Sequence, residues 1–248
     1  MKKKVSIAFF FCVCYNKSNK GGIGMVKLCI FDLDGTVLDT VGTIAHYGNG
    51  ALVKHGIEPI ETRQYNFLAG KGARILVRGM LEYRNCYSEE LFERVFADYN
   101  EAYNKDVTHG TTVFEGLCEV LDALKARGIK LAIVSNKPDF AAQTVVNKIY
   151  GEGYFDFVTG QREGIALKPD PAAVLAVMER FGATREECVY VGDTGVDMET
   201  GKNAGLYTVG VLWGFRGREE LKYFGADVLV ERPPALYDCI LTFERSKR

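Results

Sequence analysis

Short apolar runs alternate with helical stretches along most of the chain, and this alternation strongly limits the folds open to it. The apolar runs lie at 28–31, 130–134, 155–158, 188–191 and 206–209. The helical stretches lie at 117–124, 139–149, 171–181 and 196–203. Regular alternation of strand and helix predicts a parallel sheet with helices on both faces. We therefore expect an α/β fold with a Rossmann-like sheet.

The segment between residues 43 and 110 departs from this alternation, because it holds no strand run of comparable strength. Its apolar residues follow a helical period instead: Ile75, Leu76, Met80 and Tyr83 form one stripe, and Phe92, Val95, Phe96, Tyr99 and Tyr103 another. We predict an inserted α-helical cap at 43–110. The catalytic core would then comprise 25–42 and 111–248.

Residues 1–24 stand apart from the rest. Three lysines at positions 2–4 and the apolar run 5–15 are similar to the start of a signal peptide. The run is too short to span a bilayer, and no clear small-residue cleavage site follows it. The alternative is that Met25 is the true start and the extension is a misassigned one. We favour that alternative and expect a cytoplasmic protein without a membrane anchor.

Composition excludes several classes of protein. The net charge is -1, and no basic stripe accompanies it, so nucleic-acid binding is not expected. The seven cysteines include no C-x-x-C pair, which argues against a disulfide framework and a zinc ribbon. A hydrophobic fraction of 47% and a charged fraction of 25% are typical of a soluble globular chain.

Polar residues cluster where the predicted strands end. In an open parallel sheet, ligands bind outside the carboxyl ends of the strands. We therefore expect these residues to share one cleft. They are Asp32 and Asp34 after the first strand, Ser135 and Asn136 after Val134, Asp193 and Asp197 after Val191, and Lys168 before the helix near Pro171.

Four carboxylates in one cleft would repel one another unless a hard cation neutralised them, and oxygen ligands of this kind suit Mg²⁺. Aspartate can act as a nucleophile toward phosphorus. Lys168 and Ser135 would supply a positive charge and a hydroxyl for the oxygens of a transferred phosphoryl group. Taken singly, each of these motifs is equally compatible with a turn, a helix cap or a solvated loop.

Together the motifs resemble the four signatures of haloacid dehalogenase-like phosphatases. The matching segments, in chain order, are Phe31–Thr36, Val134–Asn136, Lys168–Pro171 and Val191–Asp197. The resemblance implies that Asp32 is the nucleophile and Asp34 the general acid and base. It implies that Ser135 and Lys168 hold the phosphoryl group, with Thr36 and Asn136 beside the substrate. Magnesium would be bound by Asp32, Asp34 through its backbone carbonyl, and Asp193, with Asp197 as a ligand or as support behind them.

Asp34 separates this chain from the dehalogenases proper, which it resembles only at the first aspartate. The segments 68–76 and 210–221 are similar to phosphoglycolate phosphatases, a subgroup with a small helical cap. Within the first of them, Lys71 and Arg74 either pair with a substrate carboxylate or are solvated charges at a helix end.

The resulting hypothesis is magnesium-dependent hydrolysis of a small phosphorylated metabolite through a phosphoaspartate, with 2-phosphoglycolate as the leading substrate. The partner would be this metabolite alone, and the chain a monomer or a small homo-oligomer. One alternative is a hexose phosphomutase, which shares the nucleophile and the cap. Another is a phospho-accepting signalling module, although that leaves the cap and Lys168 unexplained.

Overall fold

The computed structural model describes residues 26–243, so the predictions on residues 1–24 lie outside the described residues. Within this range one parallel sheet has the order β3-β2-β1-β4-β5-β6, which confirms the expected α/β class. Its strands are β1 (Leu28–Phe31), β2 (Lys130–Pro138), β3 (Phe157–Gln161), β4 (Cys188–Gly192), β5 (Tyr207–Val211) and β6 (Val228–Val230).

The first strand lies at the centre of the sheet and is fully buried. It pairs with β2 on one side and with β4 on the other, so that Phe31 is level with Ile133 and Val191. The strand order therefore reverses at β1, with β2 and β3 on one side and β4 to β6 on the other. Because the strands are parallel, the carboxyl ends of β1, β2 and β4 lie at the same edge of the sheet. This is the place where open parallel sheets bind ligands.

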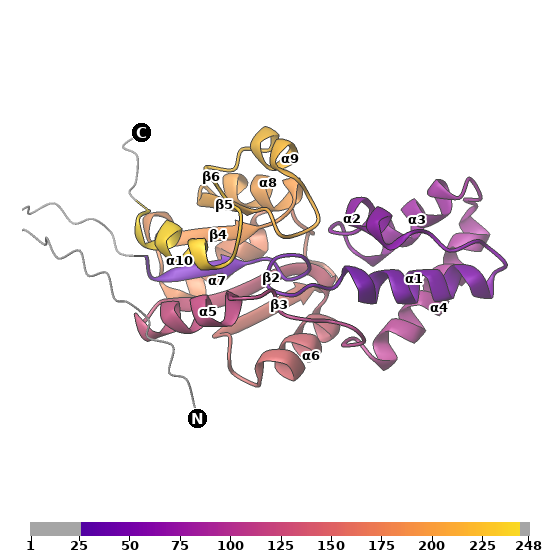
Figure 1. Ribbon diagram of the computed structural model, residues 1–248, viewed down its shortest axis with the longest axis horizontal. Coiled ribbons are helices and arrows are strands. Elements are labelled where there is room, and N and C mark those ends of the chain that lie inside the picture. The colour runs from indigo at the N-terminus through magenta and orange to yellow at the C-terminus, as the bar shows by residue number, and fades with distance from the viewer. Residues whose placement is uncertain (1–25, 244–248) are drawn as a thin grey trace, which may run out of the picture.

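Helices cover both faces of the sheet (Figure 1). The helices of the core are α5 (Leu117–Ala126), α6 (Asp139–Tyr150), α7 (Ala172–Phe181), α8 (Gly195–Asn203), α9 (Arg218–Tyr223) and α10 (Pro234–Leu241), with a 3₁₀ turn at Arg185–Glu187. Successive residues of β1 point to opposite faces. Leu28 and Ile30 pack in a cluster with α7, whereas Cys29 and Phe31 join the larger core with α5, α6 and α10.

The segment between β1 and α5 is helical, as predicted, and lies beyond the carboxyl edge of the sheet in Figure 1. It holds α1 (Val41–Lys54), a 3₁₀ turn (Thr62–Gln64), α2 (Tyr65–Leu68), α3 (Ala73–Tyr83) and α4 (Glu89–Lys105). Ser88 caps the N-terminus of α4, and its hydroxyl accepts a hydrogen bond from the Leu91 amide. We keep 43–110 as the proposed extent of a cap domain.

Some details of the prediction were wrong. Ile75 and Tyr83 are each 48% exposed, and Val77 and Leu81 take the buried places on α3. Strand β2 continues through Ser135 and Asn136 to Pro138, because its pairing with β3 resumes after a register shift. The elements α9, β6 and α10 were not predicted at all. No helix in residues 26–243 has the length and apolar character needed to cross a membrane.

Candidate active site

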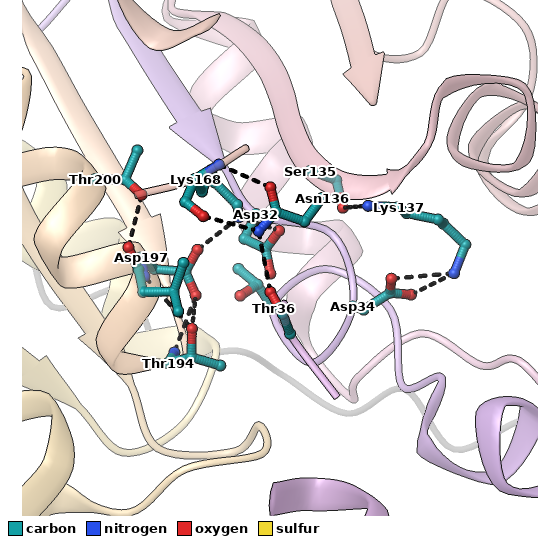
Figure 2. A network of polar contacts seen from close by, with 12 residues as sticks. Asp32, Asp34, Thr36, Ser135, Asn136, Lys137, Lys168, Thr194, Asp197 and Thr200 are labelled. Carbon is teal, nitrogen blue, oxygen red and sulfur yellow. Dashed lines mark hydrogen bonds and ion pairs between the residues drawn. The ribbon is translucent and has the colours of Figure 1, made fainter. Parts of the chain in front are cut away.

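A buried ammonium group joins two carboxylates at the carboxyl edge of the sheet. The Lys168 Nζ atom lies 2.6 Å from Oδ1 of Asp32 and 2.7 Å from Oδ1 of Asp197. All three side chains are at most 7% exposed. Asp32 directly follows β1, and Lys168 comes from the loop before α7, so the sheet brings together residues 136 positions apart (Figure 2).

Asp197 is held in place by the first turn of α8. Its Oδ2 accepts hydrogen bonds from the Thr194 hydroxyl at 2.6 Å and the Thr194 amide at 3.0 Å. The Thr194 hydroxyl in turn accepts from the Asp197 amide, which completes a capping box. Because both oxygens of Asp197 already have donors, its main visible role is to orient Lys168 toward Asp32.

Asp193 follows β4 and is fully buried. The Thr36 hydroxyl donates to its Oδ1 at 2.9 Å, and the Phe215 amide donates to its Oδ2 at 2.7 Å. Two glycines leave room for this carboxylate. A Cβ atom on Gly35 would lie 2.2 Å from Asp193 Oδ2, and one on Gly214 would lie 2.3 Å from the same atom.

The three buried carboxylates form a compact acidic group. One oxygen from each of Asp32, Asp193 and Asp197 lies within 4.8 Å of the other two. Burial, followed by repulsion from Asp197, raises the pKa of Asp32 to about 7. The same two causes, in the same order, raise the pKa of Asp193 well above its ordinary range. Lys168 alone therefore does not compensate the charge of the group.

Asp34 points away from this group and toward a second lysine (Figure 2). The Lys137 Nζ atom donates to both carboxylate oxygens of Asp34, at 2.8 and 3.0 Å. The Lys137 side chain is only 4% exposed. Sequence reasoning missed this residue, because a lysine two positions after Ser135 has no meaning until the fold places it opposite Asp34.

Ser135 and Asn136, which form the second motif, make hydrogen bonds around the site. The Asn136 side chain accepts a hydrogen bond from the Lys168 amide at 2.9 Å and donates to the Lys168 carbonyl at 3.2 Å. It also donates to the Gly70 carbonyl in the helical insert, at 3.3 Å. Ser135 is 7% exposed, and its hydroxyl accepts from the Lys137 amide at 3.2 Å.

A cavity opens between this edge of the sheet and the helical insert. Its core wall includes Asp32, Asp34, Ser135, Asn136 and Lys137. Its insert wall is contributed by Ile44, Ala69, Gly70, Gly72, Ala73, Leu76, Tyr99, Asn100, Tyr103 and Asn104. From the sequence, helix packing was favoured for Tyr99 and Tyr103, with a substrate wall as the alternative, and in the structure both side chains are buried and also line the cavity.

Lys71 and Arg74, the two residues considered as partners of a substrate carboxylate, do not line this cavity. Lys71 is exposed. The Arg74 guanidinium pairs with Glu93 at 2.5 Å and stacks over Phe92, with its centre 4.6 Å from the ring centroid. The structure thus gathers Asp32, Asp193, Asp197 and Lys168 with Thr36, Ser135 and Asn136, and leaves Lys71 and Arg74 apart.

Comparisons with known proteins identify the family of the chain. A protein family described as haloacid dehalogenase-like hydrolases matches residues 29–211. A phosphoglycolate phosphatase from Aquifex aeolicus is 32% identical over 192 residues, covering 77% of this chain and 86% of that protein. Another from Rhodobacter capsulatus is 33% identical over 193 residues, covering 77% and 87%.

Solved structures share the fold. A Lactobacillus delbrueckii subsp. bulgaricus protein provisionally named a phosphoglycolate phosphatase has a TM-score of 0.83 and 30% identity, covering 88% of this chain and 99% of that one. A β-phosphoglucomutase from Clostridium difficile has a TM-score of 0.70 at 24% identity, covering 86% and 93%, which shows the fold alone. The chain belongs to the haloacid dehalogenase-like hydrolases, and its relatives make it a phosphatase of that family.

Proposed function

We propose that this phosphatase hydrolyses a small phosphomonoester through a phosphoaspartate on Asp32, with Mg²⁺ as its cofactor and 2-phosphoglycolate as its leading substrate. The observation that carries the proposal is the buried Lys168 ammonium, held between Asp32 and Asp197. It places a fixed positive charge beside a carboxylate that lies on the wall of a cavity.

Asp32 has the properties of a nucleophile. Its Oδ1 accepts from Lys168, whereas its Oδ2 accepts no hydrogen bond from any described residue. That oxygen keeps its lone pairs for attack on phosphorus. Lys168 would then be close enough to neutralise charge on the phosphoryl oxygens, and the Ser135 hydroxyl on the same wall would donate to them.

The acidic group fits a hard divalent cation. Its carboxylate oxygens are the kind of ligand that such a cation prefers, and the raised pKa values of Asp32 and Asp193 show that a further positive charge beside them is favourable. Asp32, Asp193 and the backbone carbonyl of Asp34 would hold the ion, with Asp197 behind them. Thr36 and the Phe215 amide already orient Asp193 for this purpose. When bound, Mg²⁺ would polarise a phosphoryl oxygen and offset its charge.

The side chains account for both halves of the reaction. An Asp32 oxygen forms a bond to phosphorus while the ester P–O bond breaks. Asp34 takes part in its protonated form, with one oxygen released from Lys137, and gives its proton to the departing alcohol oxygen. Water then attacks phosphorus and the bond to Asp32 breaks, while Asp34 takes a proton from that water. The products are the alcohol and inorganic phosphate.

The choice of 2-phosphoglycolate is supported by the relatives named phosphoglycolate phosphatase. The hexose phosphomutase alternative is supported only by likeness of fold. Incubation with glucose 1-phosphate separates the two, because a hydrolase releases free phosphate and a mutase returns the phosphoryl group to a sugar.

The deciding experiment is Asp32→Asn, assayed for phosphate release from a panel of phosphorylated metabolites with Mg²⁺. Asparagine keeps the shape of the side chain but lacks the attacking oxygen, so turnover should fall by several orders of magnitude while the thermal unfolding transition remains. General acid–base losses alone run to about 10²–10⁴. Retention of more than about a hundredth of wild-type turnover would show that Asp32 is not the nucleophile.

A further inference from the structure

The cavity contains a cation that the phosphoryl chemistry does not use. Among the described residues that line it, Lys137 is the only positively charged one, since Lys168 lies behind Asp32. Lys137 is buried, and its partner is Asp34. The Asp34 carboxylate thus holds the Lys137 ammonium on the cavity wall, and the ammonium supplies a positive charge there.

A second donor without a proper acceptor lies beside this lysine. Tyr103, on α4, is 5% exposed, and its hydroxyl oxygen is close enough to the Lys137 ammonium to interact with it, but within residues 26–243 the hydroxyl proton has no acceptor. The Lys137 ammonium lies 4.9 Å from the centroid of the Tyr103 ring. A ligand that accepts a hydrogen bond from this hydroxyl therefore gains affinity, because it satisfies a buried donor.

Two amides extend the same wall. Asn100 and Asn104 lie on α4 one turn apart, line the cavity and make no side-chain hydrogen bond to the described part of the chain. Together with Tyr103 and Lys137 they give this end of the cavity donors from both the helical insert and the core. These donors could together hold an anion beside Lys137, which in the structure already pairs with the Asp34 carboxylate.

The position of Asp34 fixes what that anion is. If Asp34 gives its proton to the leaving oxygen, that oxygen lies against the Asp34 carboxyl group. The Lys137 Nζ atom lies 2.8 Å from the same carboxyl group. A charged group one methylene beyond the leaving oxygen is therefore within reach of Lys137. Lys71 and Arg74 have no such position, because neither lines the cavity.

We propose that Lys137 and Tyr103 determine specificity by binding a carboxylate carried by the leaving group, one methylene from the ester oxygen. This inference rests on the proposed function and assigns its leaving-group subsite. Lys137 exchanges part of its contact with Asp34 for the substrate carboxylate, and the Tyr103 hydroxyl donates to the same carboxylate.

The test compares kcat/KM for 2-phosphoglycolate with kcat/KM for the phosphate ester of glycolamide, which has the same shape without the charge. Wild type should prefer the acid by about 10- to 100-fold, the range of a charge-assisted hydrogen bond. In Lys137→Met the ratio should fall close to one, mainly through KM. Lys137→Arg should keep most of the preference, and Tyr103→Phe should lose part of it.

Lys105→Met is the matched control. This lysine lies on α4, as Tyr103 does, but its side chain is 71% exposed and pairs with Glu101. Removal of its charge should leave the ratio unchanged. If the preference instead falls as far as in Lys137→Met, the effect is a general one of charge and the proposal is wrong.

The competing explanation is that Lys137 only positions Asp34. Both alcohols need a proton to leave, so loss of positioning should reduce kcat for the two esters equally, and that result would overturn the inference. A wild type without preference for the acid would overturn it too, whether or not Lys137→Met folds. Failure to release phosphate from any ester, nitrophenyl phosphate included, would instead refute the proposed function, and this inference with it.

Discussion

Without bound metal, the free energy of unfolding should fall as the pH rises from 5 to 7.5. With bound Mg²⁺ this dependence on pH should disappear. The Asp32 carboxyl group has a pKa of about 7 in the folded chain against an ordinary value of 3.8. The folded state therefore keeps a proton that the unfolded chain has already lost between those values. Stability contributed by the protonated group is complete below pH 3.8 and is lost as the pH rises toward 7.

The size of the effect follows from the two pKa values. Between pH 5 and pH 7.5 the loss from Asp32 is about 2.5 kcal/mol in the free energy of unfolding. In a chain of this size that corresponds to a fall of about 5–10 °C in Tm. The raised pKa of Asp193 acts in the same direction. Bound Mg²⁺ favours the ionised carboxylates, so saturation with Mg²⁺ should remove the loss.

The assay is thermal unfolding at pH 5 and pH 7.5, with metal-free protein and with saturating Mg²⁺. The stabilisation by Mg²⁺ should be larger at pH 7.5. In the metal-free protein, Asp32→Asn should remove the part of the pH-dependent loss that Asp32 contributes, while the part that Asp193 contributes remains. Asp106→Asn is a matched control, because this carboxylate is exposed and its pKa is already lowered by Thr108. A stabilisation by Mg²⁺ that is equal at both pH values would refute the reasoning.

Two further substitutions test other parts of the site. Asp34→Asn should slow the first step far more with an alkyl phosphate than with nitrophenyl phosphate, whose leaving group needs no proton. With the nitrophenyl ester it should release a burst of phenol and then stall, and pre-steady-state kinetics would show this; equal losses and no burst would leave Asp34 a structural residue. Gly214→Ala should displace the Asp193 carboxylate, since the new Cβ would lie 2.3 Å from Oδ2. Titration with Mg²⁺ should then show affinity reduced by about tenfold or more, whereas unchanged affinity would place the metal elsewhere.

The candidate site residues that were identified from the sequence share one property. Asp32 and Asp193 each follow a short, buried, β-branched or apolar strand, and parallel pairing with β1 at the centre brings strand ends to one edge. At these positions the local sequence pattern marks the end of a strand, and the sheet topology brings that end to the site. The sequence alone was therefore enough to locate these residues. Lys168 was found for a similar reason, because it precedes a helix that returns the chain to that edge.

Lys137 shows where such reasoning stops. It pairs with Asp34 across 103 positions of the chain, and neither residue carries a signal that names the other. The strand that holds it was predicted to end at Val134, since polar residues followed. In the structure β2 continues past the shift in register, and this continuation turns the Lys137 side chain toward the cavity wall.

The helical insert posed a different difficulty. Helical periodicity identified α3 and α4, but a period cannot fix which residues face inward when a helix has apolar side chains on two faces. Ile75 was assigned to the packed side and is 48% exposed. The short elements near the C-terminus escaped notice because a three-residue strand such as β6 has too few positions for any pattern to repeat.

The loop after β5 joins these parts into one site. Trp213 donates its indole N–H to the Thr36 carbonyl at 3.0 Å, and the Phe215 amide donates to Asp193. The next residue, Arg216, donates to the Ala69 carbonyl at 3.1 Å. Adjacent residues of one loop therefore contact both the acidic group and the helical insert. A displacement of this loop would move Asp193 and the insert wall together, so cation binding and leaving-group selection are expected to be coupled through it.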